Sequence, residues 1–364
     1  MDVQQRVLNA ISGEKMPDRV PIFVPAMYQS VNDAFTNETG KKPKLGKCLC
    51  NNIDLTPLTN LGVDICEVPG PPHIKPETPL PRLDTDLILD KYGRIFSKRN
   101  YSGINFLIYQ GPYLITEDKI KDWDHIRIDT IQNGWEESIY DEIINCIDKH
   151  EMCPVFKVCD GLYSKLEEGV GIENTALLLH DYPDFVDLHL EKIHKICYHD
   201  AKTLLNAGAA FLMIEDDITI QNRPIITPDL VQEYLLKYYK KIVELIHDKG
   251  GIAFFKTKGD VLNVIDTILD AGFDVIHITQ PDQTYLEELK VFYGDKITVM
   301  GNLDVLSMLS YGTPVQVRKN VYELMNFAKS GGKYIFGTNG DLPSSTSLAN
   351  LVEMVSSAKR YGTY

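Results

Sequence analysis

The chain has 364 residues, of which 44% are hydrophobic and 24% are charged, so it can bury a large core. Its net charge of −14 argues against nucleic acid as a partner, because the phosphate backbone would be repelled. No apolar run approaches the ~18 residues that span a membrane, and the polar start "MDVQQRVLNAISGEK" has no apolar signal core. Seven cysteines without a Cys-x-x-Cys pair indicate free thiols and predict a cytoplasmic protein.

Apolar runs alternate with amphipathic stretches along most of the chain, which is typical of βα units. Two runs, 20–26 and 63–69, come early. Six more strands are predicted after Met152, at 153–160, 210–217, 251–258, 273–280, 296–302 and 334–339. Helices are predicted near 183–206, 228–248, 260–271, 284–293, 314–330 and 346–360.

Eight parallel strands with intervening helices predict a (β/α)₈ barrel that occupies the chain as one domain. The segment from about 70 to 150 is too long for one loop, so we expect an insertion between strands 2 and 3. Within it, "DLILDKYGRIFSKRNYSG" predicts an antiparallel hairpin that turns at Lys91-Tyr92-Gly93. An open doubly wound sheet is the alternative, but no Gly-x-Gly-x-x-Gly motif follows a strand.

Active sites of such barrels lie at the carboxyl ends of the strands. The polar residues near these ends are Tyr28, Glu67, Asp160, Glu215, Asp216, Asp217, Lys256, Lys258, His277, Asn302, Asp304, Asn339 and Asp341. Lysine is depleted in strands and is rarely buried alone. Because side chains alternate along a strand, Lys256 and Lys258 share one face, and we expect that face to point into the mouth of the barrel.

Two interpretations of these lysines remain open. They form structural ion pairs with the acids of the neighbouring strand, or they make a cationic floor for an anionic or oxygen-bearing substrate. An isolated histidine such as His277 is more often a satisfied core residue than a ligand. A metal held by Glu215, Asp217, Cys159 and His277 is a further alternative.

Several segments resemble the uroporphyrinogen decarboxylase superfamily. They include "DVQQRVLNAISGEKMPDRVPIF", "LLNAGAAFLMIEDD", "PDLVQEYLLKYYKKIVELIHDKGG", "DTILDAGFDVIHITQPDQTYLEELKVFYGDKITVMGNLDV" and "LANLVEMVSSAKRYGTY", in that order. The resemblance covers nearly the whole chain. It implies a (β/α)₈ barrel, and it implies either the decarboxylase or the related methyltransferases that move methyl groups to or from corrinoid (cobalamin-type) proteins.

The decarboxylase itself is a poor match. Its arginines after the first strand, which clamp the propionates of the substrate, have no counterpart in "VPAMYQSVNDAF". Its histidine near the last strand is absent from "FGTNGDLP". The acid expected after the second strand is at best Glu67, whereas the tyrosine after the third strand is matched by Tyr163.

The thiol-methylating branch binds zinc through His-x-Cys after the fifth strand, and this chain has Lys256 and Lys258 there. Protonated lysine cannot bind zinc, so zinc is not expected in that position. The resemblance therefore predicts a corrinoid-dependent methyltransferase with a small methyl donor or acceptor. Lys256 or Lys258 would stabilise the leaving oxygen, its pKa lowered by burial or by the other ammonium, with Tyr163 as a further catalytic candidate. Asp216, Asp217 or Glu215 would hold and tune the lysines.

Tyr28, Glu67, Asp160, Glu215, His277, Asn302 and Asn339 are predicted to bind the substrate. Two alternatives stay open beside the methyltransferase. One is a decarboxylase, and the other is a non-catalytic relative that binds a corrinoid, a corrinoid protein or a small ligand.

Overall fold

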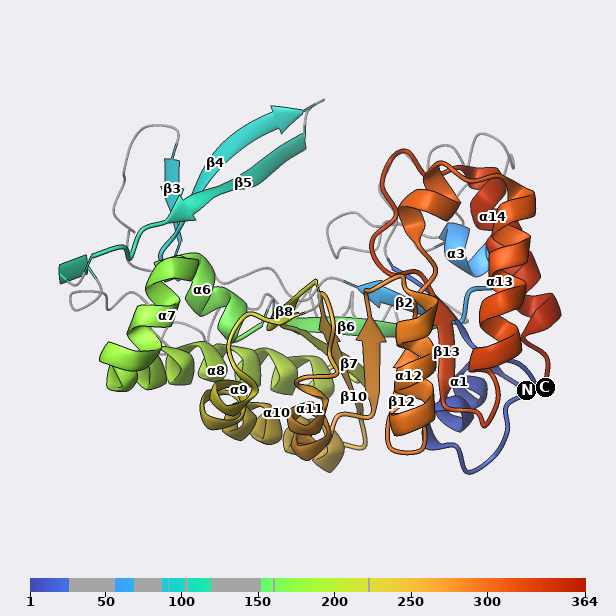
Figure 1. Cartoon of the computed structure of the whole chain (residues 1–364), viewed down its shortest axis with the longest axis horizontal. Helices are drawn as coiled ribbons and strands as arrows, with labels where there is room; N and C mark the ends of the chain where they lie inside the picture. Colours follow the sequence, from blue (N-terminus) through green and yellow to red (C-terminus); the bar gives the residue numbers. More distant parts are fainter. Residues whose placement is uncertain are drawn as a thin grey trace.

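A computed structural model describes residues 1–25, 56–68, 87–90, 92–101, 104–116, 118–119, 152–159, 161–221 and 223–364. Eight parallel strands close into a barrel in the order β1-β13-β12-β11-β10-β7-β6-β2 (Figure 1). They are β1 Ile22–Val24, β2 Ile65–Val68, β6 Cys153–Cys159, β7 Phe211–Glu215, β10 Ile252–Thr257, β11 Val275–Ile278, β12 Thr298–Met300 and β13 Tyr334–Gly337. All eight predicted strands and the predicted (β/α)₈ barrel are confirmed.

Helices surround the barrel. They are α1 Val3–Ser12, α3 Thr56–Leu61, α6 Tyr163–Val170, α7 Ile172–Asp181, α8 Pro183–Asn206, α9 Pro228–Tyr234, α10 Leu236–Asp248, α11 Ile265–Ala271, α12 Gln283–Tyr293, α13 Pro314–Ala328 and α14 Leu348–Tyr361. A π-helix, η2 Val305–Ser310, and a short ribbon of β8 Thr219–Ile220 and β9 Arg223–Pro224 lie in loops. The predicted helix at 228–248 divides in two. No helix in the described part of the chain is long and apolar enough to cross a membrane.

The inside of the barrel is filled by alternate residues of the strands, as a two-residue period requires. The inward apolar side chains are Phe23, Ile65, Val155, Met213, Phe254, Val275, Met300 and Ile335. Val7 and Ile11 of α1 join this cluster. Helix α1 therefore packs against the interior of the barrel. On each strand, the residues that follow this apolar layer must lie at the end of the barrel where the strands terminate.

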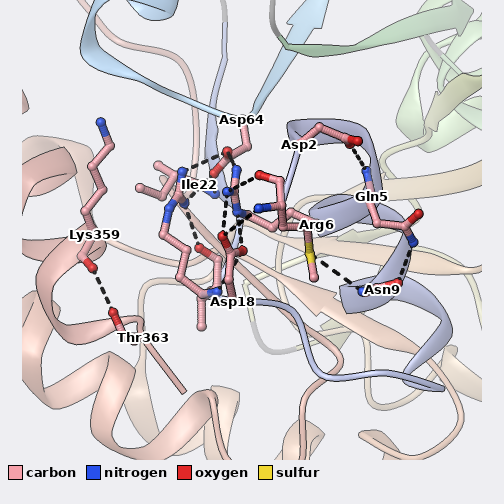
Figure 2. Close-up of polar contacts among 12 residues, drawn as sticks. Asp2, Gln5, Arg6, Asn9, Asp18, Ile22, Asp64, Lys359 and Thr363 are labelled. Atoms are coloured by element: carbon pink, nitrogen blue, oxygen red, sulfur yellow. Dashed lines mark hydrogen bonds and ion pairs between the residues drawn. The ribbon is translucent and has the colours of Figure 1, made fainter.

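A cluster of ion pairs connects α1 to the residues where β1 and β2 begin (Figure 2). The buried carboxylate of Asp64 accepts hydrogen bonds from Arg6 at 2.9 Å, from Arg19 at 2.6 and 2.9 Å, and from the Ile22 backbone N–H at 2.8 Å. Arg6 also pairs with Asp18 at 2.7 Å. Because this cluster lies at the amino ends of the strands, it stabilises the barrel and is remote from the mouth.

The insertion carries a three-stranded antiparallel sheet with the order β3-β4-β5. The strands are β3 Leu87–Leu89, β4 Arg94–Tyr101 and β5 Ile104–Pro112. The predicted hairpin between β3 and β4 is confirmed, and Gly93 in its turn has a φ of +80°, which favours glycine. The sheet rests on α6 through Arg94, which contacts Glu168 at 2.6 Å. Figure 1 shows β4 and β5 projecting away from the barrel.

Candidate active site

Four charged side chains form a ring at the mouth, which we call the charge ring: Glu67, Lys157, Glu215 and Lys256. Each of them follows an inward apolar residue by two positions, so each continues the inward face of its strand. Their strands β2, β6, β7 and β10 are consecutive neighbours in the barrel. Negative and positive side chains therefore alternate around this half of the mouth.

Each carboxylate in the charge ring bridges two lysines. Lys256 Nζ lies 3.0 Å from Glu67 Oε2 and 3.3 Å from Glu215 Oε1. Lys157 Nζ lies 2.5 Å from Glu215 Oε2 and 3.4 Å from Glu67 Oε1. The formal charges sum to zero, so the ring is no cationic floor, and the ion-pair interpretation of Lys256 is confirmed.

The ion pairs fix the charge of these groups. Burial would raise the pKa of Glu215, but Lys256 and Lys157 outweigh it and lower that pKa to about 2. Burial would lower the pKa of Lys256, but Glu67 and Glu215 outweigh it and raise that pKa above its usual value. The prediction that the pKa of Lys256 is lowered is therefore wrong. Lys256 stays an ammonium, and the third of its N–H donors has no acceptor among the described residues.

His277 stands beside Lys256, because β11 pairs with β10 in that register. Its Nε2 lies 2.9 Å from the Thr338 carbonyl oxygen, so Nε2 carries the proton and donates it. Burial lowers the pKa of His277 to about 4, so the ring is neutral at pH 7. Its Nδ1 has no hydrogen-bond partner within the described structure. His277 is thus a buried acceptor next to a buried cation.

The two predicted asparagines serve the loops above the barrel. Asn302 donates to the carbonyl oxygens of Gln280 at 2.7 Å and Asp282 at 3.1 Å, and its buried Oδ1 has no partner in the described part of the chain. Asn339 Oδ1 accepts from the Val305 backbone N–H at 3.0 Å, where η2 begins. Asn302 keeps one polar atom available, whereas Asn339 holds a loop.

Lys258 lies apart from the charge ring. It follows the last residue of β10, and its side chain is 68% exposed. Its Nζ contacts Asp217 Oδ2 at 2.6 Å, and its backbone N–H donates to Asp217 Oδ1 at 3.2 Å. The two lysines therefore occupy different environments, although their spacing predicts one shared site. The strand ends before Lys258, and the alternation no longer holds there.

Asp216 serves α6. Its fully buried carboxylate accepts hydrogen bonds from the backbone N–H groups of Leu162, Tyr163 and Ser164, from the Ser164 hydroxyl, and from the Tyr239 hydroxyl at 2.7 Å. As the acceptor, this carboxylate satisfies N–H groups that have no partner within the helix at its start. The prediction that Asp216 holds the lysines is corrected: its side chain alternates with those of Glu215 and Asp217 and points out of the barrel.

Tyr163 begins α6 and is 2% exposed. Burial raises the pKa of its hydroxyl, as do the nearby carboxylates Glu167 and Asp216, and the hydroxyl bonds to Glu167. Tyr163 therefore stays protonated and is a hydrogen-bond donor. Tyr28 and Asp160 lie outside the described residues, as does the side chain of Cys159.

Lys157 is the member of the charge ring that the sequence did not single out. The signal is present, since it is a lysine inside an apolar strand at the inward parity of Val155. The pairing of β6 with β7 shifts register just after Lys157, which separates this residue from the end of its strand. For metals, the described residues hold no group of three or more His, Cys, Asp or Glu side chains that could bind an ion.

One solved structure agrees with this barrel. A methyltransferase from Methanosarcina mazei has the same fold, with a TM-score of 0.71, 16% identity and 99% of each chain covered. A sugar phosphate isomerase/epimerase from Parabacteroides distasonis ATCC 8503 has a TM-score of 0.37 and 10% identity, over 96% of this chain and 97% of its own. No curated protein matches in sequence. The family model for uroporphyrinogen decarboxylase (URO-D) matches residues 110–361, more than half of the chain. The chain therefore belongs to the uroporphyrinogen decarboxylase family.

Proposed function

We propose that this protein is a methyltransferase that moves a methyl group between a small substrate and the corrinoid of a partner protein. The observation that carries the proposal is the state of Lys256, a buried ammonium held between Glu67 and Glu215 with one N–H that has no acceptor among the described residues. Such a group suits a leaving oxygen better than it suits a metal. The methyltransferase fold from Methanosarcina mazei gives the proposal its structural precedent.

The charge of the mouth argues against the decarboxylase alternative. A substrate with many carboxylates needs free cations, but both lysines inside the ring are paired with carboxylates. Lys258 is paired with Asp217 as well. Asp341 adds a further carboxylate near the ring, since the charges of Lys256 and Glu67 both act on its pKa. The described mouth therefore disfavours a polyanion.

The zinc site of the thiol-methylating relatives does not fit these residues. Lys256 stands where the zinc-binding relatives have the histidine of His-x-Cys. Its raised pKa keeps it protonated, so its nitrogen has no lone pair to donate to zinc. Zinc therefore has no part in the proposed reaction. The chemistry must rest on hydrogen bonds and on the nucleophile that the second substrate brings.

In methyl transfer from an ether, the C–O bond of the donor breaks and its electron pair stays on the oxygen. The methyl group would be received by a nucleophile that a reduced Co(I) corrinoid of the partner protein would supply when bound. Lys256 donates its spare N–H to the oxygen as negative charge develops there, and solvent then supplies the proton. The raised pKa makes Lys256 an electrostatic donor rather than a general acid. The two carboxylates hold the ammonium in place before the reaction begins.

A spectroscopic assay tests this function. The full-length protein is mixed with a Co(I) corrinoid and a panel of methyl ethers, methylamines and methanol, and the visible spectrum of the corrinoid is followed. Protein-dependent methylation with one donor class supports the proposal. Ligand binding without methylation across the panel supports the non-catalytic alternative, and release of carbon dioxide from a carboxylated substrate supports the decarboxylase. The predicted cytoplasmic location fits the buried thiol of Cys153.

A further inference from the structure

One of the two ring nitrogens of His277 has no hydrogen-bond partner in the described structure. Nε2 donates to the Thr338 carbonyl oxygen at 2.9 Å, whereas Nδ1 is buried and meets no donor among the described residues. A buried acceptor without a donor destabilises the folded protein, so native structures keep few of them. The contact with Thr338 explains the position of the ring. It does not explain a side chain with a second nitrogen at a position that is 0% exposed.

The edge of the His277 ring that carries Nδ1 is turned toward Lys256. Strands β10 and β12 flank β11 in the barrel. The Cδ2 edge of the ring faces the β12 side, because a Cβ at Gly301 would lie 3.7 Å from Cδ2. Nδ1 lies across the ring from Cδ2, on the side of β10, where Lys256 is the partner of His277 in the strand register. Burial lowers the pKa of His277 most and the charge of Lys256 lowers it next, so the two groups are close.

A hydrogen-bond donor and an acceptor therefore lie near each other without bonding to each other. Lys256 has an N–H that no acceptor among the described residues takes, and His277 Nδ1 is an acceptor that no described donor reaches. An ether oxygen can only accept, so it would satisfy Lys256 and leave His277 unpaired. A hydroxyl both donates and accepts. A ligand with a hydroxyl beside its ether oxygen would therefore satisfy both side chains.

We propose that His277 Nδ1 accepts a hydrogen bond from a hydroxyl group of the substrate, close to the oxygen that Lys256 binds. The substrate class is then a small hydroxylated methyl ether. A plain ether binds less well, because it leaves the buried nitrogen unpaired. His277 determines specificity in this way and transfers no proton. Because the oxygen at Lys256 belongs to the proposed function, the identity of the substrate rests on that function, but the preference for a hydroxyl can be measured without methyl transfer.

NMR titration of the full-length protein, labelled with ¹⁵N in histidine, tests this binding in the absence of a corrinoid. Two matched pairs of probes differ by a methyl group in place of the hydroxyl: 2-methoxyethanol with 1-methoxypropane, and 2-methoxyphenol with 2-methoxytoluene. We expect the hydroxylated member of at least one pair to bind about tenfold more tightly or better, as one buried acceptor left unpaired implies. It should also shift the Nδ1 resonance of His277. Equal affinities in both pairs, no binding by any of the four probes, or an unmoved Nδ1 resonance would overturn the proposal.

Variants distinguish His277 from other acceptors near the mouth. His277→Phe removes the acceptor, so the hydroxylated probe should bind no more tightly than its methyl counterpart. His277→Gln has an amide N–H for the Thr338 carbonyl and an oxygen that can accept, so it should keep part of the preference. His189→Phe is the matched control, since His189 is a buried histidine of α8 whose Nε2 has no partner in the described part of the chain, and it should keep the full preference. A preference that survives in His277→Phe would assign the hydroxyl to another acceptor, such as Asn302 Oδ1, and contradict the proposal.

The two proposals fail in different ways. A preference for the hydroxylated probes without methyl transfer in the corrinoid assay would overturn the proposed function and leave this binding site in place. Methyl transfer that is equally efficient from the two members of each probe pair would overturn the role of His277 and leave the proposed function in place.

Discussion

At the scale of the residue, Lys256 is held by a balance of opposite charges. Its ammonium lies between two carboxylates that also share Lys157. Removal of one member of such a buried set leaves the others uncompensated, which costs more than the set contributes as a whole. The same arrangement keeps Lys256 charged and fixed in place, as a hydrogen-bond donor for catalysis must be.

We predict that Lys256→Met lowers the free energy of unfolding by ~3–5 kcal/mol, because Glu67 and Glu215 then share a single lysine. The double variant Lys256→Met with Glu67→Gln should recover part of this loss, since one carboxylate charge is removed with the ammonium. Urea denaturation at pH 7 measures both. Lys258→Met is the control, and we expect at most ~1 kcal/mol because its ion pair with Asp217 is exposed. Equal effects at the two lysines would contradict the different environments described here.

At the scale of the element, α6 connects the insertion to the barrel. Asp216 binds the start of the helix, and the β3-β4-β5 sheet packs on its far end near Glu168 and Gly169. Gly169 allows the close approach, because a Cβ at this position would lie 2.0 Å from the Tyr92 carbonyl oxygen.

Gly169→Ala is therefore predicted to displace the insertion sheet from α6. Hydrogen exchange should become faster across residues 87–112, while the barrel strands keep their protection. Gly340→Ala is the matched control, since a Cβ there meets no atom within 4 Å, and it should leave the exchange pattern unchanged. Unaltered protection of β3 and β4 in Gly169→Ala would show that the close contact is not required.

The sequence predicts the elements well and their side-chain directions less well. The eight strands could be predicted because apolar runs with flanking helices have few other folded solutions. Glu67, Glu215 and Lys256 were identified from their positions at strand ends. Asp216 was misassigned because it follows the last residue of β7, and its carboxylate binds the start of α6 and not the lysines. Lys258 could not be placed by alternation, because the strand ends at Thr257.

At the scale of the whole molecule, three buried histidines couple stability to pH. Burial lowers the pKa of His189, His194 and His277 to about 4 in each case. Their pKa in the unfolded chain is about 6.5. Between these two pH values the unfolded state therefore binds more protons than the folded state. The contribution of the three histidines to the free energy of unfolding is fully present above pH ~6.5 and is lost as the pH falls toward about 4.

In that range, each of these histidines should make the free energy of unfolding fall by up to ~1.4 kcal/mol for each pH unit of acidification. His189→Leu removes one of them, at a position where Nε2 has no partner in the described structure. The variant should lose stability less steeply than the wild type when urea midpoints are compared from pH 7 down to pH 4. Parallel pH profiles would contradict the assignment of His189 as a buried neutral residue.

The family supplies a barrel whose mouth can host different chemistries, and in this chain the mouth is built from paired charges. Negative and positive side chains of the charge ring alternate around half of the mouth, and His277 adds a neutral hydrogen-bond acceptor. The paired charges of the described mouth disfavour a substrate with many carboxylates, and they leave one oriented ammonium donor. The activity of the whole molecule therefore depends on what the Lys256 ammonium does.

The most direct test compares methyl transfer by Glu67→Gln with that by Glu67→Gln plus Lys256→Met, with both proteins shown to be folded. The methyl donor in both assays is the compound that the corrinoid assay identifies with the wild-type protein. If Lys256 stabilises the leaving oxygen, loss of its N–H should slow the transfer step by ~10²–10³-fold, the effect of losing one donor to a developing oxyanion. Equal single-turnover rates for the two proteins would contradict a catalytic role for Lys256 and leave the charge ring a purely structural feature.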